Sequence, residues 1–413
     1  MKVTHVETFC LNLPFHPRPE RHMHRASTHG ERVEVCRVET DAGIVGYGEG
    51  GTGPGPIARV LHRPPAESLW DDTVGLGLQM ALLDVVGQAE GVPLYRLLGT
   101  KVRDWCPLSW WAIDMPPEDW VAEAQEAVRH GYTSFKLKAR PWRDILEQVD
   151  AVSAATPDHF RLDVDFNMFL LNPGNALRVL QELDQREKVA FYESPIPQGD
   201  VAGNRFLRAR VRKPIAMHWG LPPLMTALRE EVCDGFVIGG GLRSVLSQGA
   251  IAAEANKPFW LQMVGTGLMA AFTVHLGAVL SQAQWPAITC HELWQDDLLK
   301  SPLAVVDGYV RVPEAPGLGV EVDEAALERY RVTPGTPTPK EEWARQRHVL
   351  RVRWPDGRAW AFPNEATYQR AFYDGNLPLF ERGVTLEVLD DDGSAAFQRL
   401  YEAVQVEPVR ERV

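Results

Sequence analysis

Charged residues lie within or just after three short apolar runs in the middle of the chain, at residues 135–138, 163–167 and 192–195. Each run predicts a β-strand, and the intervals between them leave room for one helix each. Lys138, Asp165 and Glu193 are 27 and 28 positions apart, which is the length of a strand, a helix and their connections. Because the C-terminal ends of parallel strands meet on one side of a fold, we expect these side chains to converge there.

The residue types predict a general base beside a metal site. Residues i and i+2 of a strand face the same way, so Lys136 and Lys138 should point inward together, as should Asp163 and Asp165. A second cation lowers the pKa of a lysine, which makes Lys138, with Lys136 beside it, a candidate base near neutral pH. Asp165 and Glu193 can share a hard cation such as Mg²⁺, which would hold a substrate carboxylate. The cation would then stabilise the enediolate that forms when a base removes the proton α to that carboxylate. Asp163, deeper in its strand, is interpreted as a structural partner of one lysine.

Simpler interpretations compete with this chemistry. Two lysines on a strand can form a solvated edge face, and an aspartate at a strand end is more often a helix N-cap than a ligand. The functional interpretation is favoured because lysine pair, aspartates and glutamate occur on three consecutive predicted strands.

The elements that must position these residues alternate between residues 103 and 313. The predicted strands are 106–111, 133–138, 160–165, 188–193, 214–218, 234–238, 258–263 and 287–291. Helices are predicted between them at 118–130, 142–155, 175–186, 223–231, 245–255 and 268–282. About eight β/α units predict an α/β fold in which the strands close into a (β/α)₈ TIM barrel. An open doubly wound sheet would need a Gly-rich phosphate turn after its first strand, and the sequence has none there.

The barrel is flanked by two smaller regions. Residues 1–102 contain β-like runs and a helical pattern near 69–90, and the segment 15–30, rich in Pro, His and Arg, is predicted to be a loop. A Pro-rich linker begins at residue 333, followed by alternating runs and a helical end, which predict a small α+β appendage over 333–413.

Composition excludes several classes of protein. The 413 residues carry a net charge of −12, with 43 basic and 55 acidic residues, which argues against general nucleic-acid binding. The five cysteines are scattered without a CxxC motif, which is typical of a reducing compartment. No apolar run predicts a signal peptide, and none approaches the ~18 residues of a membrane span, so we expect a cytoplasmic protein without membrane contact.

Taken together, the motifs resemble the enolase superfamily, in its mandelate racemase and muconate lactonizing enzyme branch. Lys-x-Lys at 136–138, Asp-x-Asn at 165–167 and Glu-x-Pro at 193–195 are similar to the second, third and fourth barrel strands of that family. The resemblance extends to residues 46–49, 81–87, 93–99 and 316–320. It covers roughly residues 1–332 and leaves the appendage outside.

The resemblance implies a fold and an activity. An N-terminal α+β capping domain, residues 1–102 with a return segment at 314–332, would cover a modified barrel at 103–313. The expected activity is Mg²⁺-dependent abstraction of the proton α to the carboxylate of a small-molecule substrate, leading to racemisation, cycloisomerisation or dehydration of acid sugars. Relatives assemble as dimers or octamers, so a homo-oligomer is expected.

The later strands depart from the family pattern. His218 stands at or beside the position of the third carboxylate ligand, so Mn²⁺ or another divalent transition metal is an alternative to Mg²⁺. The alternative is that His218 is not a ligand and that metal binding is weak or absent. The sixth strand, with Val237, lacks the lysine or aspartate of relatives, and the seventh has neutral Gln262 without the histidine of racemases. The face opposite Lys138 therefore has no obvious base, which disfavours two-base racemisation.

Further contacts to substrate are predicted at the barrel mouth. By resemblance, Glu292 would hydrogen-bond the substrate carboxylate and His291 would act as an acid for a leaving hydroxyl. Adjacent strand residues face opposite ways, so only one of them should reach the pocket, and Glu292 is favoured. Other candidate substrate-binding residues are Asn167, Gln262, Trp110 and, from the N-terminal loop, His24 and Arg25. The alternative for the N-terminal loop is that it is only solvated, and the alternative for Trp110 is that it only packs in the barrel.

The sequence thus predicts a lyase or isomerase that dehydrates, or cycloisomerises, a hydroxy-acid or acid sugar through an enediolate. One alternative is a non-catalytic or redirected member of the same superfamily, acting as a binding or assembly protein, which the altered positions His218 and Gln262 favour. Another is a Schiff-base aldolase using Lys138, which Asp165 and Glu193 disfavour.

Overall fold

Eight parallel strands form the centre of the computed structural model, which describes residues 1–26, 28–377 and 380–412. They are β4 (Trp105–Ala112), β5 (Ser134–Lys138), β6 (Arg161–Asp165), β7 (Val189–Glu193), β8 (Ile215–His218), β9 (Gly235–Ile238), β10 (Phe259–Leu261) and β11 (Ala287–Ile288). Neighbouring strands pair in chain order from β4 to β10. β11 pairs with β4, and the bridge from Gln262 to Ile288 joins β10 to β11, so the ring closes and the predicted barrel is confirmed.

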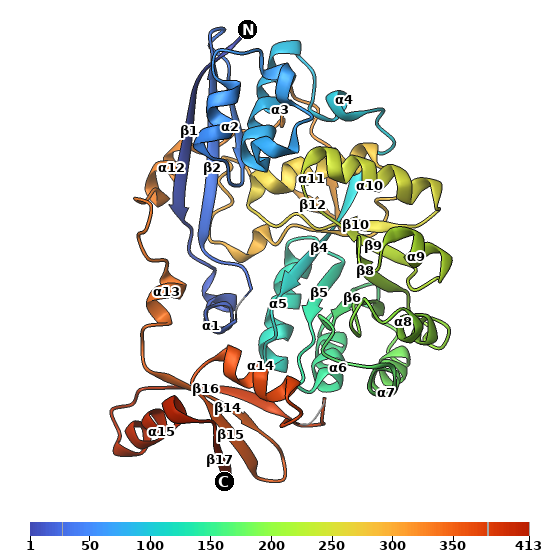
Figure 1. Ribbon diagram of the computed structural model, residues 1–413, viewed down its shortest axis with the longest axis vertical. Helices are drawn as coiled ribbons and strands as arrows, with labels where there is room; N and C mark the ends of the chain where they lie inside the picture. Colours follow the sequence, from blue (N-terminus) through green and yellow to red (C-terminus); the bar gives the residue numbers. More distant parts are fainter. Residues whose placement is uncertain (27, 378–379, 413) are drawn as a thin grey trace.

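Helices cover the outside of this barrel (Figure 1). They are α5 (Pro117–Arg129), α6 (Ile145–Ala155), α7 (Pro173–Asp184), α8 (Val201–Arg208), α9 (Leu224–Arg229), α10 (Leu242–Glu254) and α11 (Gly267–Val279). Helix α8 was missed by the sequence analysis because it is short and contains Gly203, a poor helix former. Its first turn is stabilised by Asp200, which accepts a hydrogen bond from the backbone N–H of Gly203 at 2.9 Å.

The barrel is modified at its eighth unit. After β11 the chain forms only a 3₁₀ turn, η3 (His291–Leu293), where a regular barrel would place a helix. It then returns as β12 (Val305–Val306) and β13 (Tyr309–Arg311), and β13 pairs antiparallel with β4.

The barrel interior explains why the second strand carries lysines. All five residues of β5 are buried, with Phe135 and Leu137 alternating with Lys136 and Lys138. Parallel register sets Lys136 beside Asp163 and Lys138 beside Asp165, and Asp165 in turn beside Glu193. The lysines and carboxylates therefore lie at matching heights on adjacent strands.

The N-terminal region is a separate antiparallel sheet packed on a helix. It consists of β1 (Val3–Asn12), β2 (Arg32–Thr40), β3 (Val45–Glu49), α2 (Pro54–Val60), η1 (Pro65–Ser68), η2 (Asp72–Val74), α3 (Leu76–Glu90) and α4 (Tyr95–Leu98). Gly48 of β3 allows close packing on α3, because a Cβ there would lie 2.1 Å from the carbonyl oxygen of Gly77. The return segment joins this region through α12 (Glu324–Tyr330) and a hydrogen bond from the backbone N–H of Leu318 to Asp84 at 2.8 Å.

The expected loop at 15–30 is wrong in part, because it contains the helix α1 (Pro17–Arg25). Pro17 is favourable at the first helical position, and basic residues in the last turn suit the helix dipole. The helix has only nine residues and a second proline at Pro19, so it is too short to be stable alone and depends on packing, with Met23 and Arg25 buried. Tertiary packing therefore decides a segment whose composition predicted a loop.

The C-terminal region is a second antiparallel sheet, which confirms the predicted α+β architecture. It comprises α13 (Pro339–Trp343), β14 (His348–Arg353), β15 (Arg358–Phe362), α14 (Glu365–Tyr373), β16 (Thr385–Asp390), α15 (Ala395–Val406) and β17 (Val409–Arg412), with strand order β16-β14-β15-β17. The domain boundaries at 102, 313 and 333 stay predictions. Within the described residues, no helix has the length and apolar character needed to cross a membrane.

A buried ionic cluster joins this C-terminal region to the barrel and to α1. Arg25 lies 2.8 Å from Asp114 and donates to the hydroxyl of Tyr368 at 2.6 Å. Arg143 lies 3.6 Å from Asp114 and donates to the carbonyl of Leu386. Burial favours the neutral carboxyl, but the two guanidinium groups hold the pKa of Asp114 below its usual value. Asp114 is therefore the shared counter-charge of both guanidinium groups, and Glu365 lies 3.9 Å from Arg25 as a second one.

We predict that Asp114→Asn lowers the free energy of unfolding by about 3–5 kcal/mol, because two buried guanidinium groups lose their counter-charge. Urea denaturation measures the change. Asp150→Asn is the matched control, because it breaks an exposed ion pair with Arg186 and should cost less than about 1 kcal/mol. Equal losses in the two variants would contradict the role given to Asp114.

Candidate active site

Two buried lysines and two buried carboxylates meet at the C-terminal end of β5, β6 and β7. The Nζ atom of Lys136 lies 2.5 Å from Glu193 Oε2 and 3.4 Å from Asp165 Oδ2. The Nζ atom of Lys138 lies 2.5 Å from Asp165 Oδ2. Lys136 also donates to the side-chain oxygen of Gln262 across the barrel at 2.7 Å. The structure thus brings together five residues that the sequence analysis selected.

Burial and neighbouring charges shift the pKa values of the two lysines in opposite directions. Burial lowers the pKa of Lys138; Asp165 offsets part of this effect, Lys136 adds to it, and the pKa stays below its ordinary value. Burial also acts against the charged form of Lys136, but Glu193 and Asp165 outweigh it and raise the pKa of that lysine. Lys136 is therefore the permanent cation and Lys138 the amine that can give up its proton.

The pKa values of Asp163 and Asp165 are also shifted in opposite directions. Burial favours neutral Asp165, but Lys138 and Lys136 outweigh it and lower its pKa. Burial raises the pKa of Asp163 to about 7, and Lys136 offsets only part of that rise. Among the described residues no ion pair joins Asp163 to a lysine, so its expected role as a structural partner stays a prediction.

Asp165, Glu193 and His218 carry donor atoms for a divalent cation, although the three donors are not gathered closely enough in this structure to form a complete ligand set. Asp165 and Glu193 are register partners on adjacent strands, and the Nε2 atom of His218 lies 3.0 Å from Glu193 Oε1. The His218 side chain is 46% exposed, so it is open to the barrel mouth. The oxygens of the two carboxylates are ligands that Mg²⁺ prefers, whereas the imidazole nitrogen favours a transition metal. The Lys136 ammonium already lies against both carboxylates, so a bound cation would compete with it for them.

Asn167 is held by its neighbours at the end of β6. Its backbone N–H donates to Asp165 Oδ1 at 2.9 Å, and its side-chain oxygen accepts a hydrogen bond from Arg140 at 2.9 Å. Its φ of +43° lies in the left-handed region, where Asn is tolerated better than most residues. The sequence analysis missed Arg140, although it continues the i+2 spacing of Lys136 and Lys138.

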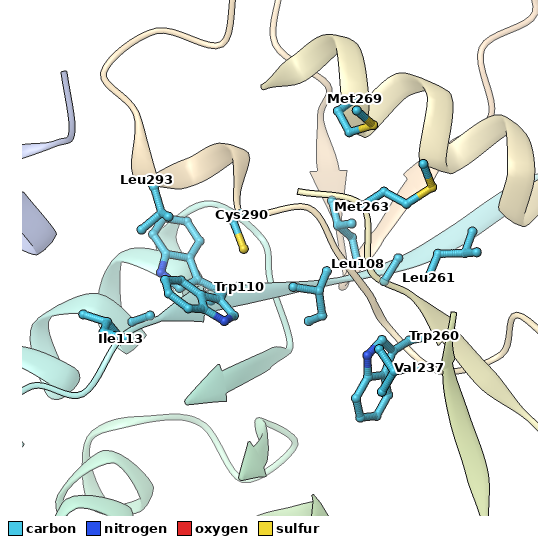
Figure 2. Packing of buried hydrophobic residues seen from close by; sticks show 14 of the residues in the cluster. Leu108, Trp110, Ile113, Val237, Trp260, Leu261, Met263, Met269, Cys290 and Leu293 are labelled. Carbon is cyan, nitrogen blue, oxygen red and sulfur yellow. The ribbon is translucent and has the colours of Figure 1, made fainter. Parts of the chain in front are cut away.

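A small cavity opens beside this cluster. Its volume is about 260 Å³, and it is lined by His218, Trp219, Val237, Gly239, Gly240, Gln248 and Gln262. Figure 2 shows Trp260 against Val237, its register partner on β9. The ring of Trp260 lies 5.4 Å from the Nζ atom of Lys136. Val237, Trp260 and Gln262 contribute neutral side chains here, and the expected lack of a base opposite Lys138 stays a prediction.

His291 and Glu292 lie elsewhere than expected. β11 ends at Ile288 and both residues belong to η3, so the alternation argument that only one of them reaches the pocket is wrong. Both line a cavity of about 620 Å³, which also includes Trp110 and Tyr132. The backbone N–H of Trp111 donates to Glu292 at 2.7 Å. Burial raises the pKa of Glu292 to about 8 and lowers that of His291 to about 4, so both are mainly neutral at pH 7.

Three predicted substrate contacts are engaged in the fold. Trp110 donates to Glu123 at 3.0 Å, and His24 contacts Glu31 at 3.0 Å. Arg25 is bound in the buried cluster around Asp114. A role for Trp110, His24 or Arg25 in substrate binding would require these interactions to break.

Two aromatic residues that the sequence did not single out face the lysines. The Trp111 ring lies 5.9 Å from Lys138 Nζ, and His29 packs edge-on against Trp111 with ring centroids 5.1 Å apart. His29 was one of several basic residues in an aperiodic segment, so nothing in its spacing distinguished it. The inward direction of Trp111 follows from β-alternation on β4, which also turns Trp110 outward.

Comparison with known proteins agrees with this geometry. Residues 119–326 match the family model described as enolase C-terminal domain-like. The N-succinyl-L-Arg/Lys racemase of Bacillus cereus is 22% identical over 372 residues, covering 80% of this chain and 98% of that protein. Muconate cycloisomerase 1 of Pseudomonas putida is 27% identical over 267 residues, covering 62% and 70%. D-gluconate dehydratase of Thermoproteus tenax is 25% identical over 311 residues, covering 67% and 59%.

The fold is also found in solved structures. The crystal structure of the N-succinyl Arg/Lys racemase from Bacillus cereus ATCC 14579 superposes with a TM-score of 0.68 at 21% identity, covering 81% of this chain and 99% of that chain. The fold is therefore shared with that structure, and this chain belongs to the enolase C-terminal domain-like family, in the mandelate racemase and muconate lactonizing enzyme branch of the enolase superfamily.

Proposed function

We propose that this protein removes the proton α to the carboxylate of a small hydroxy-acid or acid sugar and eliminates water from it, with cycloisomerisation as the alternative outcome. The observation that carries the proposal is the division of the lysine pair, in which Lys138 has a lowered pKa while Lys136 is held charged by Glu193. Related proteins include a dehydratase, a cycloisomerase and a racemase, so the family chemistry alone does not select the reaction.

Lys138 would act as the base. Its neutral amine takes the α-proton, and the C–H electron pair passes toward the carboxylate to give the enediolate. The enediolate then collapses, forming the Cα=Cβ bond as the C–O bond to the β-hydroxyl breaks. The proton on Lys138 can then pass to the departing hydroxide on the same face, giving water and restoring the amine. Asp165 accepts a hydrogen bond from Lys138 and fixes its direction. The charged Lys136 lies in the same cluster and favours negative charge on the substrate.

A divalent cation would be held by Asp165, Glu193 and His218. Mg²⁺ is the expected ion from the family, and Mn²⁺ or another divalent transition metal is the alternative that His218 introduces. When bound, the ion supplies positive charge that stabilises an enediolate.

The wall opposite Lys138 supports elimination over racemisation. Gln262 is neutral, and its side-chain oxygen is taken by Lys136, so it cannot accept a proton from the second face. Gln262 and Asn167 are proposed to hydrogen-bond the substrate. The cavity of about 260 Å³ beside them suits a compact polar acid. A homo-oligomer, either a dimer or an octamer, is proposed from family membership.

A non-catalytic binding role is the second candidate. The observation that favours it is the contact of Lys136 with both Glu193 and Asp165, because carboxylates already paired with an ammonium attract a divalent ion less strongly.

We predict that Lys138→Met lowers turnover of an acid-sugar substrate at least about 100-fold, because the base is removed. A screen of acid sugars for formation of the keto-acid product identifies the substrate and measures the rate. Lys213→Met is the matched control, because within the described residues the Nζ atom of this half-buried lysine donates only to the backbone carbonyl of Glu187. Complete racemisation of a test acid with exchange of its α-proton on both faces would exclude the proposed one-sided mechanism.

The pH dependence gives a separate prediction. The base acts when deprotonated, so kcat/KM should rise with pH through the lowered pKa of Lys138. Lys136 lowers that pKa, so Lys136→Met should move the rising limb to higher pH, besides any loss of rate. A limb that stays in place or moves to lower pH would show that Lys136 does not set the pKa of the base.

Metal binding separates the two candidate functions. We predict that calorimetry detects one divalent ion per chain, that Asp165→Asn and Glu193→Gln abolish its binding, and that His218→Asn weakens Mn²⁺ more than Mg²⁺. Asp150→Asn, an exposed carboxylate variant, should bind as the wild type does. A wild-type protein that binds neither ion would favour the non-catalytic role.

A further inference from the structure

One lysine of the C-terminal region binds the segment that connects α1 to β2. The Nζ atom of Lys340, in α13, donates to the backbone carbonyls of Ala26, Thr28 and His29, the last two at 3.2 Å each. The backbone N–H of Lys340 also donates to Glu31 at 2.7 Å. A single side chain thus gathers three carbonyls that have no secondary structure to satisfy them.

The same segment carries His29 to the lysine pair. The imidazole packs edge-on against Trp111, whose ring lies 5.9 Å from Lys138 Nζ. Burial, with smaller contributions from the charges of Lys138, Lys136 and Lys340, lowers the pKa of His29 to about 3, so the ring is neutral at pH 7. A neutral imidazole offers one donor and one acceptor, which suits a hydroxyl group.

The backbone of His29 needs an external restraint. Its φ of +39° is uncommon for a residue with a side chain, and such conformations persist when surrounding contacts hold them. Lys340 binds the carbonyl of this same residue.

Other contacts fix α13 and its linker beside this segment, as Figure 1 shows for α13 and α1. Arg32 donates to the carbonyl of Thr336 at 2.6 Å, and Asn12 donates to that of Pro337 at 2.8 Å. The family match ends at residue 326, so Lys340 lies beyond it. The clamp is therefore built by residues outside the matched family region.

We propose that the C-terminal region completes the wall of the active site, with Lys340 as a positioning residue that holds His29 toward a hydroxyl of the bound acid. The part of this proposal that concerns substrate rests on the proposed function, whereas the clamp itself can be tested without turnover.

The first experiment is hydrogen–deuterium exchange. In Lys340→Met, amides of residues 28–31 should exchange at least about tenfold faster than in the wild type, because charge-assisted hydrogen bonds are lost. Amides of the C-terminal sheet should be unchanged. Lys300→Met is the control, because its exposed amine pairs only with Glu321, and it should leave residues 28–31 unchanged. Unchanged exchange at 28–31 in Lys340→Met, or an equal rise throughout the C-terminal sheet, overturns the clamp.

If Lys340→Met does not fold, the same exchange experiment is done with Lys340→Gln. The shorter amide keeps a donor, so a smaller rise in exchange confined to residues 28–31 supports the clamp, and no change there overturns it.

The second experiment separates positioning from chemistry. With the acid found by the substrate screen, Lys340→Met should raise KM roughly tenfold and change kcat by less than about threefold, the size expected when an ordered hydrogen bond to substrate is lost. Lys340→Met should add no further rise in the His29→Ala background, because both act through the same ring. Additive effects would overturn the link between Lys340 and His29. If the wild type turns over no acid, the proposed function fails, while the exchange experiment still decides the clamp.

Discussion

The ionic cluster inside the barrel is the constraint on which the rest of the structure depends. Burying an ion costs several kcal/mol unless its charge and hydrogen bonds are matched, so Lys136, Lys138, Asp165 and Glu193 must be placed together. The parallel register of β5, β6 and β7 does this, because it sets the lysines of β5 beside the aspartates of β6 and sets Asp165 beside Glu193, which Lys136 reaches at 2.5 Å. A shift of one residue on any of these strands would turn its charges into the apolar layer beneath the helices. The register that allows folding is thus the same one that assembles the site.

The surrounding elements continue this logic outward. The cluster of Arg25, Asp114 and Arg143 is a second buried set of charges, and it joins α1, the loop after β4 and the start of α6 to the C-terminal region. Lys340 extends the connection to the segment that bears His29. Charged contacts therefore link the C-terminal sheet to the active-site wall, where an apolar interface alone would leave the angle between them less defined.

Sequence reasoning succeeded where one local pattern determines the structure. Apolar runs at a regular interval predicted all eight strands, and i+2 spacing predicted the convergence of the lysines and carboxylates. It failed where tertiary contacts decide. Helix α1 is too short to be stable without its packing contacts, and Cys290, with φ of +57°, turns the chain out of β11 before Glu292. The placement of His29 depends on Lys340, which lies over 300 positions away in the sequence, so no local pattern could reveal it.

The asymmetry of the barrel wall limits the chemistry more than the presence of a metal does. On one side, Lys138 can exchange a proton; on the other, the described residues Trp260, Val237 and Gln262 offer aromatic, aliphatic and amide groups. In the proposed mechanism, an enediolate formed there regains or passes on a proton on the Lys138 face. The geometry therefore favours products in which bonds break and form on a single face, which is the stereochemistry of syn elimination and of one-sided ring closure.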